Sequence, residues 1–116
     1  GMPGVQTLLP ILLNEVSKNI ISISDVVRLT SYNPKRIFKV KNKGLIKKGY
    51  DADFTFVDLN KRQKISNRMI KSKCGWTPFH GMNIQGWPIG TMIMGKKGFW
   101  KDKLVSKPTG QPLKFN

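Results

Sequence analysis

Two sets of side chains in this sequence are of types that could do chemistry. His80 is the only histidine, and it lies in a loop rich in aromatic residues, glycine and proline. Asp51, Asp53 and Asp58 bracket a short apolar run, where carboxylates commonly accept hydrogen bonds from backbone N–H groups at turns. A catalytic zinc takes about three protein ligands plus water, and neither set supplies them. We therefore predict no catalytic residue and no metal site in this chain, and we expect His80 to be a structural residue whose hydrogen bonds are satisfied.

The single cysteine, Cys74, excludes a disulfide bond within the chain and favours a reducing compartment, so we expect a cytoplasmic protein. Lys71 and Lys73 are near it in sequence, and nearby positive charge lowers the pKa of a thiol. No histidine partner for Cys74 is identifiable. We therefore expect Cys74 to be buried and unreactive.

Basic residues dominate the charge of the chain. Lysine and arginine outnumber aspartate and glutamate by 21 to 6, which gives a net charge of +15, and the excess follows Pro34. Such a surface attracts phosphate polyanions, and Trp76, Phe79 and Trp87 among the lysines could stack on single-stranded nucleic acid. The same aromatic residues could instead pack a core beneath a solvated lysine surface. We expect core packing, and a small basic nucleic-acid-binding module is the alternative.

The length of 116 residues fits one domain, or part of one, with one modest core. No apolar run approaches the roughly 18–20 residues of a membrane span. The first residues also lack the basic start of a signal peptide. We therefore expect no membrane partner.

The first third of the sequence has helical periodicity. Thr7 is a candidate N-cap, and apolar residues at helical spacing predict a helix that ends at about Lys18. Ser22 and Asp25 have the spacing of a capping pair, which predicts a second helix. This helix should end near Tyr32, because Pro34 disfavours helical backbone in the residue before it. Ile37 and Phe38 would pack a short turn after this proline.

The remainder has the composition of short strands and turns, beginning at the segment 44–58, in which Gly44 and Gly49 mark changes of direction. Residues 54–57 predict a strand that Asp58 ends. Residues 61–66 predict a weak edge strand, and residues 76–88 predict a largely irregular stretch. Residues 89–94 predict a strand that pairs back with 97–100. The predicted fold class is α+β, with a helical segment over 1–43 and a β-rich segment over 44–116.

Three stretches of the sequence carry a resemblance to one family. Residues 44–58 resemble the segment where amidohydrolase-superfamily enzymes leave their barrel and enter a small β-sandwich. Residues 1–10 are similar to the loop and helix start after the eighth barrel strand of cyclic amidohydrolases, and residues 72–81 with 86–88 resemble a late segment of dihydroorotases and allantoinases. The resemblance implies the C-terminal part of a dihydroorotase-like protein: the last helices of a (β/α)8 barrel followed by part of a composite β-sandwich.

The resemblance also implies a function. Dihydroorotases catalyse the reversible ring closure of N-carbamoyl-aspartate to dihydroorotate in pyrimidine biosynthesis with zinc, and allantoinase or hydantoinase ancestry is the nearest rival. The family's metal ligands lie outside this chain, which we expect to be inactive alone and to carry no cofactor. Expected partners are the missing N-terminal barrel portion or a second copy, with a small cyclic amide bound only in the full-length context. A piece that complements a truncated amidohydrolase is a further alternative. The backbone positions that the resemblance places over the substrate ring are Gly1, Met2, Pro3 and Gly4.

Overall fold

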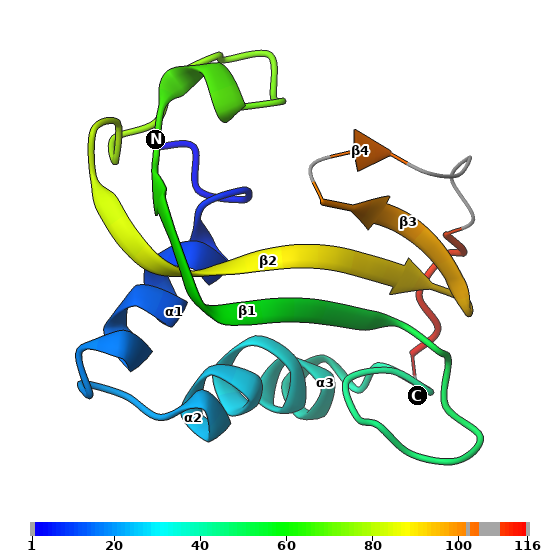
Figure 1. Ribbon diagram of the computed structural model, residues 1–116. Helices are drawn as coiled ribbons and strands as arrows, with labels where there is room; N and C mark the ends of the chain where they lie inside the picture. Colours follow the sequence, from blue (N-terminus) through cyan, green and yellow to red (C-terminus); the bar gives the residue numbers. More distant parts are fainter. Residues whose placement is uncertain (1, 102, 105–109, 116) are drawn as a thin grey trace. The chain divides into compact units, whose positions relative to one another are not determined.

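The computed structural model describes residues 2–101, 103–104 and 110–115 (Figure 1). Gly1 therefore lies outside the described residues. The chain divides into two compact units: the first comprises Gly1–Ser22 and Asp58–Pro88, and the second comprises Ile23–Val57 and Ile89–Asn116. Each unit combines a helical stretch with parts of the strands, so the predicted mixture of helix and strand is confirmed.

The first unit begins with helix α1, Leu8–Ser17, close to the predicted bounds. Pro10 lies in its first turn, where its missing N–H leaves no hydrogen bond unmade. Thr7 occupies the N-cap position, but its side chain caps no N–H group of the helix. Its hydroxyl instead donates to the carbonyl of Gly4 at 3.5 Å. The start of the helix is therefore held through Gly4, whose carbonyl also accepts the N–H groups of Thr7 and Leu8.

The helical part of the second unit runs further than predicted. Helix α2, Ile23–Val27, continues as a π-helical turn, Arg28–Tyr32, and then as helix α3, Asn33–Phe38. The expected end near Tyr32 is wrong, because Asn33 keeps helical φ and ψ angles before Pro34. The widened turn provides the physical reason: the N–H of Asn33 bonds to the carbonyl of Arg28, five residues earlier. The chain leaves the helix at Lys39, which adopts a left-handed conformation.

Four strands form one sheet in the order β1-β2-β3-β4. Their bounds are Phe54–Lys64, Asn83–Ile93, Lys96–Trp100 and Lys103–Leu104. Strands β2 and β3 pair antiparallel, as predicted for 89–94 and 97–100, and β3 pairs antiparallel with β4. A short 3-10 helix, Asn67–Met69, lies between β1 and β2 in the sequence.

Both long strands exceed their predicted lengths. Strand β1 does not end at Asp58, whose carboxylate accepts the N–H groups of Asn60 and Lys61 at 2.9 and 3.2 Å while the strand continues. The separate edge strand expected at 61–66 is the second half of β1. Strand β2 begins at Asn83, within the stretch expected to be irregular, and it includes Pro88. Pairing with a neighbouring strand decides both lengths, and local composition does not encode it.

The core of the first unit forms around Ile65, Ile84 and Trp87, which are all buried. Four partly buried side chains pack against them: Ile11, Met69, Phe79 and Met82. Leu13 is also buried, and Gly86 of β2 approaches it so closely that a Cβ there would lie 2.7 Å from the Leu13 Cβ. Helix α1 and this part of β2 are therefore tightly packed.

The second unit has little buried apolar surface among its described residues. Val26 is buried, whereas Val27, Leu29, Ile37 and Phe38 are each at least half exposed. Phe56 of β1 and Trp100 of β3 form an edge-on ring pair with 5.7 Å between centroids. Among the described residues, no helix is long and apolar enough to cross a membrane.

Candidate functional site

The loop before α1 carries the backbone positions that the sequence assigns to substrate contact. Pro3 is partly buried, while Met2 and Gly4 are exposed. Gly4 has an ordinary backbone conformation, and a Cβ built on it would meet nothing within 4 Å. Neither conformation nor crowding within the described residues therefore requires glycine at this position. An open backbone of this kind is accessible to a ligand or to another polypeptide.

A glutamine that the sequence analysis did not single out bridges this loop to a distant segment. The side-chain Oε1 of Gln6 accepts the N–H of Lys71 at 2.9 Å. Its Nε2 donates to the carbonyl of Met69. The residue type alone carries no signal for this contact, because its partners are backbone groups more than 60 positions away.

His80 has the structural role that was predicted. Its Nδ1 accepts the N–H of Asn67 at 2.9 Å, and the side-chain oxygen of Asn67 accepts the N–H of Thr77 at 2.9 Å. These two bonds close the stretch between the 3-10 helix and β2 on itself. One ring nitrogen of the only histidine is thereby committed to a backbone donor.

Cys74 is exposed, so the prediction that it is buried is wrong. Cys74 lies in a turn closed by the bond from the Gly75 N–H to the Ser72 carbonyl at 3.2 Å, and residues 71–76 are all exposed. The hydroxyl of Ser72 lies 3.1 Å from the sulfur, and this hydrogen bond is the largest influence that lowers the pKa of the Cys74 thiol. The neighbouring lysines that the sequence suggested are not among the causes.

The three aromatic residues divide between core and surface. Trp87 is a core residue and Phe79 packs against it, which confirms the core-packing prediction for these two. Trp76 is 42% exposed, so the prediction fails there. The set therefore does not form an exposed stacking surface as a group.

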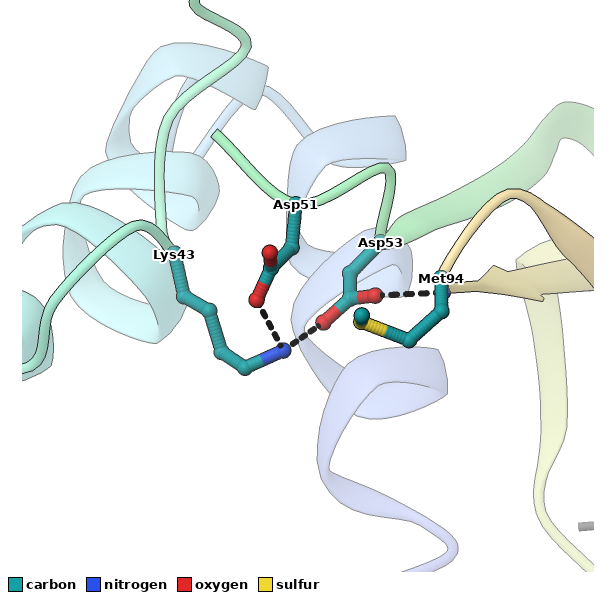
Figure 2. Close-up of polar contacts among 4 residues, drawn as sticks. All are labelled: Lys43, Asp51, Asp53 and Met94. Carbon is teal, nitrogen blue, oxygen red and sulfur yellow. Dashed lines mark hydrogen bonds and ion pairs between the residues drawn. The ribbon is translucent and has the colours of Figure 1, made fainter. Parts of the chain in front are cut away.

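The carboxylates Asp51 and Asp53 share one cation in the second unit (Figure 2). Lys43 Nζ lies 3.0 Å from Asp51 Oδ2 and also pairs with Asp53 Oδ2, while Asp53 Oδ1 accepts the N–H of Met94 at 2.8 Å. The last contact is of the predicted kind, a carboxylate accepting a backbone N–H. The role of Lys43 was not recognisable from the sequence, because nothing in its spacing distinguishes it from the surrounding lysines. The cluster fastens the segment before β1 to the turn between β2 and β3.

This cluster shifts two pKa values. The hydrogen bond to Asp53 is the largest cause that raises the pKa of Lys43. Burial raises the pKa of Asp53, but the bonds from Lys43 and from the Met94 N–H, together with the lysine charge, outweigh it, so its pKa lies below the ordinary value. Both shifts favour the charged forms. The carboxylates are engaged in an ion pair with a structural role.

The donor set does not fit the zinc that the family resemblance implies. Across residues 2–101, 103–104 and 110–115, no three histidine, cysteine, aspartate or glutamate side chains come together to hold a metal ion. His80 uses Nδ1 for a backbone donor, and Asp51 and Asp53 face Lys43.

Comparison with known proteins decides the family. A family model described as "Amidohydrolase family" matches residues 5–98. The chain belongs to this family. The resemblance to the amidohydrolase superfamily is thereby confirmed, since the match includes residues 5–10 and all of 44–58, 72–81 and 86–88.

The amidohydrolase chain is similar to curated dihydroorotases. It is 40% identical over 113 residues to "Dihydroorotase" of Pyrococcus furiosus, which covers 97% of this chain and 27% of that protein. It is also 40% identical over 110 residues to "Dihydroorotase" of Methanosarcina acetivorans, covering 93% and 23%. The chain therefore spans about a quarter of the length of these relatives.

Solved structures give a second comparison. The L-hydantoinase (dihydropyrimidinase) from Arthrobacter aurescens has a TM-score of 0.87 to the amidohydrolase chain at 29% identity, covering 92% of this chain and 24% of that one. A D-hydantoinase gives a TM-score of 0.85 at 26% identity, covering 94% and 24%. Both matches again involve about a quarter of the longer protein.

Proposed function

We propose that this chain is the C-terminal part of a metal-dependent cyclic amidohydrolase of the dihydroorotase type. The parent reaction would be the reversible ring closure of N-carbamoyl-aspartate to dihydroorotate in pyrimidine biosynthesis. The observation that carries the proposal is the 40% identity to a named dihydroorotase over 97% of the chain. The two hydantoinase structures match at 29% and 26% identity. The dihydroorotase reaction is therefore better supported than hydantoin opening.

In the proposed parent, helices α1 to α3 would be the last helices of a (β/α)8 barrel, and strands β1 to β4 would form part of a β-sandwich. The exposed side chains of the second unit support this placement. Ile37 and Phe38 are 65% and 64% exposed, and Val27 and Leu29 are about half exposed. A helix that is apolar on several sides is normally covered by protein. Burying a large apolar side chain contributes about 1.5–3 kcal/mol.

The proposed partner is accordingly the remaining N-terminal portion of an amidohydrolase, about three times as long as this chain in the relatives above. That portion would bind the zinc, and this chain would contribute no metal ligand and no catalytic side chain. The loop of Gly1, Met2, Pro3 and Gly4 would lie against the cyclic amide substrate. Gly4 supports this role, because nothing within the described residues requires a glycine there.

A second copy of the chain is the alternative cover for the exposed apolar side chains of α2 and α3. Light scattering across a concentration series tests this alternative. A dimer that persists on addition of the N-terminal portion would support a second copy as the partner. A nucleic-acid-binding module has less support, since Phe79 and Trp87 belong to the core. Such a module would bind nucleic acid with an affinity that falls steeply as the salt concentration rises.

The proposed reaction is tested by a chimera in which this chain replaces the matched C-terminal part of the Pyrococcus furiosus dihydroorotase. The expected result is zinc-dependent opening of dihydroorotate, with a kcat/KM for hydantoin at least about tenfold lower. The unaltered Pyrococcus enzyme is the control for folding and metal content. A folded, zinc-loaded chimera that opens hydantoin but leaves dihydroorotate intact would contradict the dihydroorotase assignment.

A further inference from the structure

The contact between Gln6 and the segment 69–71 joins two parts of the first unit by one side chain. Gln6 Oε1 accepts the Lys71 N–H at 2.9 Å, and Gln6 Nε2 donates to the Met69 carbonyl. The partners are 65 and 63 residues away in sequence. A primary amide carries an acceptor oxygen and a donor nitrogen on the same carbon, so it can accept and donate within one plane. It therefore matches a backbone that presents a carbonyl and, two residues later, an N–H.

The segment that receives Gln6 is itself fixed to the core. The Met69 side chain packs against the cluster around Ile65 and Trp87. The Met69 N–H donates to the Ser66 carbonyl at 3.2 Å. Ile70 is extended, so the Met69 carbonyl before it and the Lys71 N–H after it point to the same side. The acceptor carbonyl and donor N–H are therefore held in a defined position.

The loop on the other side of the contact has little anchorage of its own. Met2 is 74% exposed and Val5 is fully exposed, so apolar packing does not hold either residue. The Gly4 carbonyl bonds to the start of α1, and Thr7 is buried there. Gln6 lies between these points and carries a direct bond to a distant part of the unit.

We infer that Gln6 is a positioning residue: its amide fastens the loop of Met2, Pro3 and Gly4 to the segment 69–71 and so sets the backbone that contacts the substrate. The substrate part of this inference rests on the proposed function, whereas the fastening does not. Both hydrogen bonds described for the Gln6 amide are to backbone groups. It would act on the reaction through the loop.

The fastening is tested in the full chain by amide hydrogen exchange at Lys71, followed by NMR. Gln6→Leu removes both bonds and should speed exchange of the Lys71 N–H by about two- to tenfold, the effect of one net hydrogen bond. Gln6→Glu retains an acceptor for Lys71 but loses the donor to Met69, so the Lys71 N–H should stay protected. Gln111→Leu makes the same change at an exposed residue of the other unit and should leave Lys71 unaffected. Exchange at Lys71 that is unchanged in Gln6→Leu would overturn the fastening.

The positioning role is tested in the Pyrococcus chimera described above. Gln6→Leu should raise KM for dihydroorotate about tenfold and change kcat less than about twofold, with Gln6→Glu falling between Gln6→Leu and the unaltered chimera. Faster exchange in Gln6→Leu with an unchanged KM on an active chimera would overturn the positioning role. A chimera that is inactive with Gln6 intact would instead count against the proposed function, and the exchange result would still decide the fastening.

Discussion

The side-chain oxygen of Asn14 accepts the backbone N–H of Gln85, 71 residues further along the chain, at 3.0 Å. Asn14 is 5% exposed, and this part-buried bond ties α1 to β2 within the first unit. Adjacent to Gln85, Gly86 packs on Leu13, the residue before Asn14. One polar contact and one close apolar contact therefore set the spacing of the same two elements.

Replacing Asn14 with alanine should lower the free energy of unfolding by about 1–3 kcal/mol, because the Gln85 N–H would lose its acceptor at a part-buried position. Urea unfolding followed by tryptophan fluorescence measures the change. Lys18→Ala, at an exposed position next to the same helix, is the control and should stay within about 0.5 kcal/mol. Equal stabilities for the two variants would show that the contact contributes nothing to folding.

A second prediction separates crowding from backbone strain at glycine. Gly86 and Gly49 have nearly the same φ, 99° and 87°, but a Cβ at Gly86 would lie 2.7 Å from Leu13 while one at Gly49 would meet nothing within 4 Å. Both alanine variants incur the cost of positive φ, about 1–3 kcal/mol. Gly86→Ala should lose about 1–3 kcal/mol more through overpacking. Thermal unfolding of the two variants compares them directly, and equal losses would mean that α1 and β2 are less closely packed than described.

Much of the helical part could be predicted from the sequence, because α1 has regular apolar spacing and a proline compatible with its first turn. The strand composition of Phe54–Val57 was also recognisable. The continuation of β1 beyond Asp58 was not, since residues 58–64 are mostly polar and are extended through pairing with a neighbouring strand. In the same way, the π-helical turn that keeps Asn33 helical has no local signature.

The same distinction applies to the candidate site: a local motif could be recognised from the sequence, whereas long-range contacts could not. The family motif in the first ten residues indicated Met2, Pro3 and Gly4, because the spacing of glycine and proline can be recognised from the sequence alone. The roles of Lys43 and Gln6 depend on partners brought together by the fold. Cys74 shows the opposite error: its sequence neighbours suggested an influence from lysine, whereas its contacts are with Ser72 and the backbone of Trp76.

The lysine between the two carboxylates provides a third prediction. Lys43→Met leaves Asp51 and Asp53, which are 31% and 29% exposed, facing each other without a cation. The loss should be about 1–2 kcal/mol, less than the roughly 3–5 kcal/mol of a fully buried pair because solvent screens part of the repulsion. Lys18→Met is the matched control, since its pair with Glu15 is 3.5 Å long and Lys18 is 51% exposed. Chemical denaturation of both variants measures the difference. A loss in Lys43→Met no larger than in the control would rule out a stabilising role for the cluster.

The pKa shifts of this cluster predict how stability depends on pH. The depressed pKa of Asp53 adds stability that is present above its unfolded value, near pH 4, and is lost as pH falls through the folded value. The raised pKa of Lys43 adds stability below about pH 10 that is lost as pH rises through the folded value. Asp53→Asn keeps an acceptor for the Met94 N–H but removes the charge. It should therefore flatten the acid limb of a stability–pH curve, and an acid limb identical to the unaltered chain would contradict the assignment to Asp53.

The proposed role of this chain is to complete an amidohydrolase without supplying its catalytic residues or metal ligands. The most direct measurement mixes the purified chain with a Pyrococcus furiosus dihydroorotase that lacks the matched C-terminal part, and follows dihydroorotate opening and zinc content. The predicted result is no activity from either piece alone, activity in the mixture that saturates at one chain per partner, and zinc that remains with the partner. Zinc bound at one per chain in the isolated protein, with ring opening abolished by His80→Ala, would contradict it.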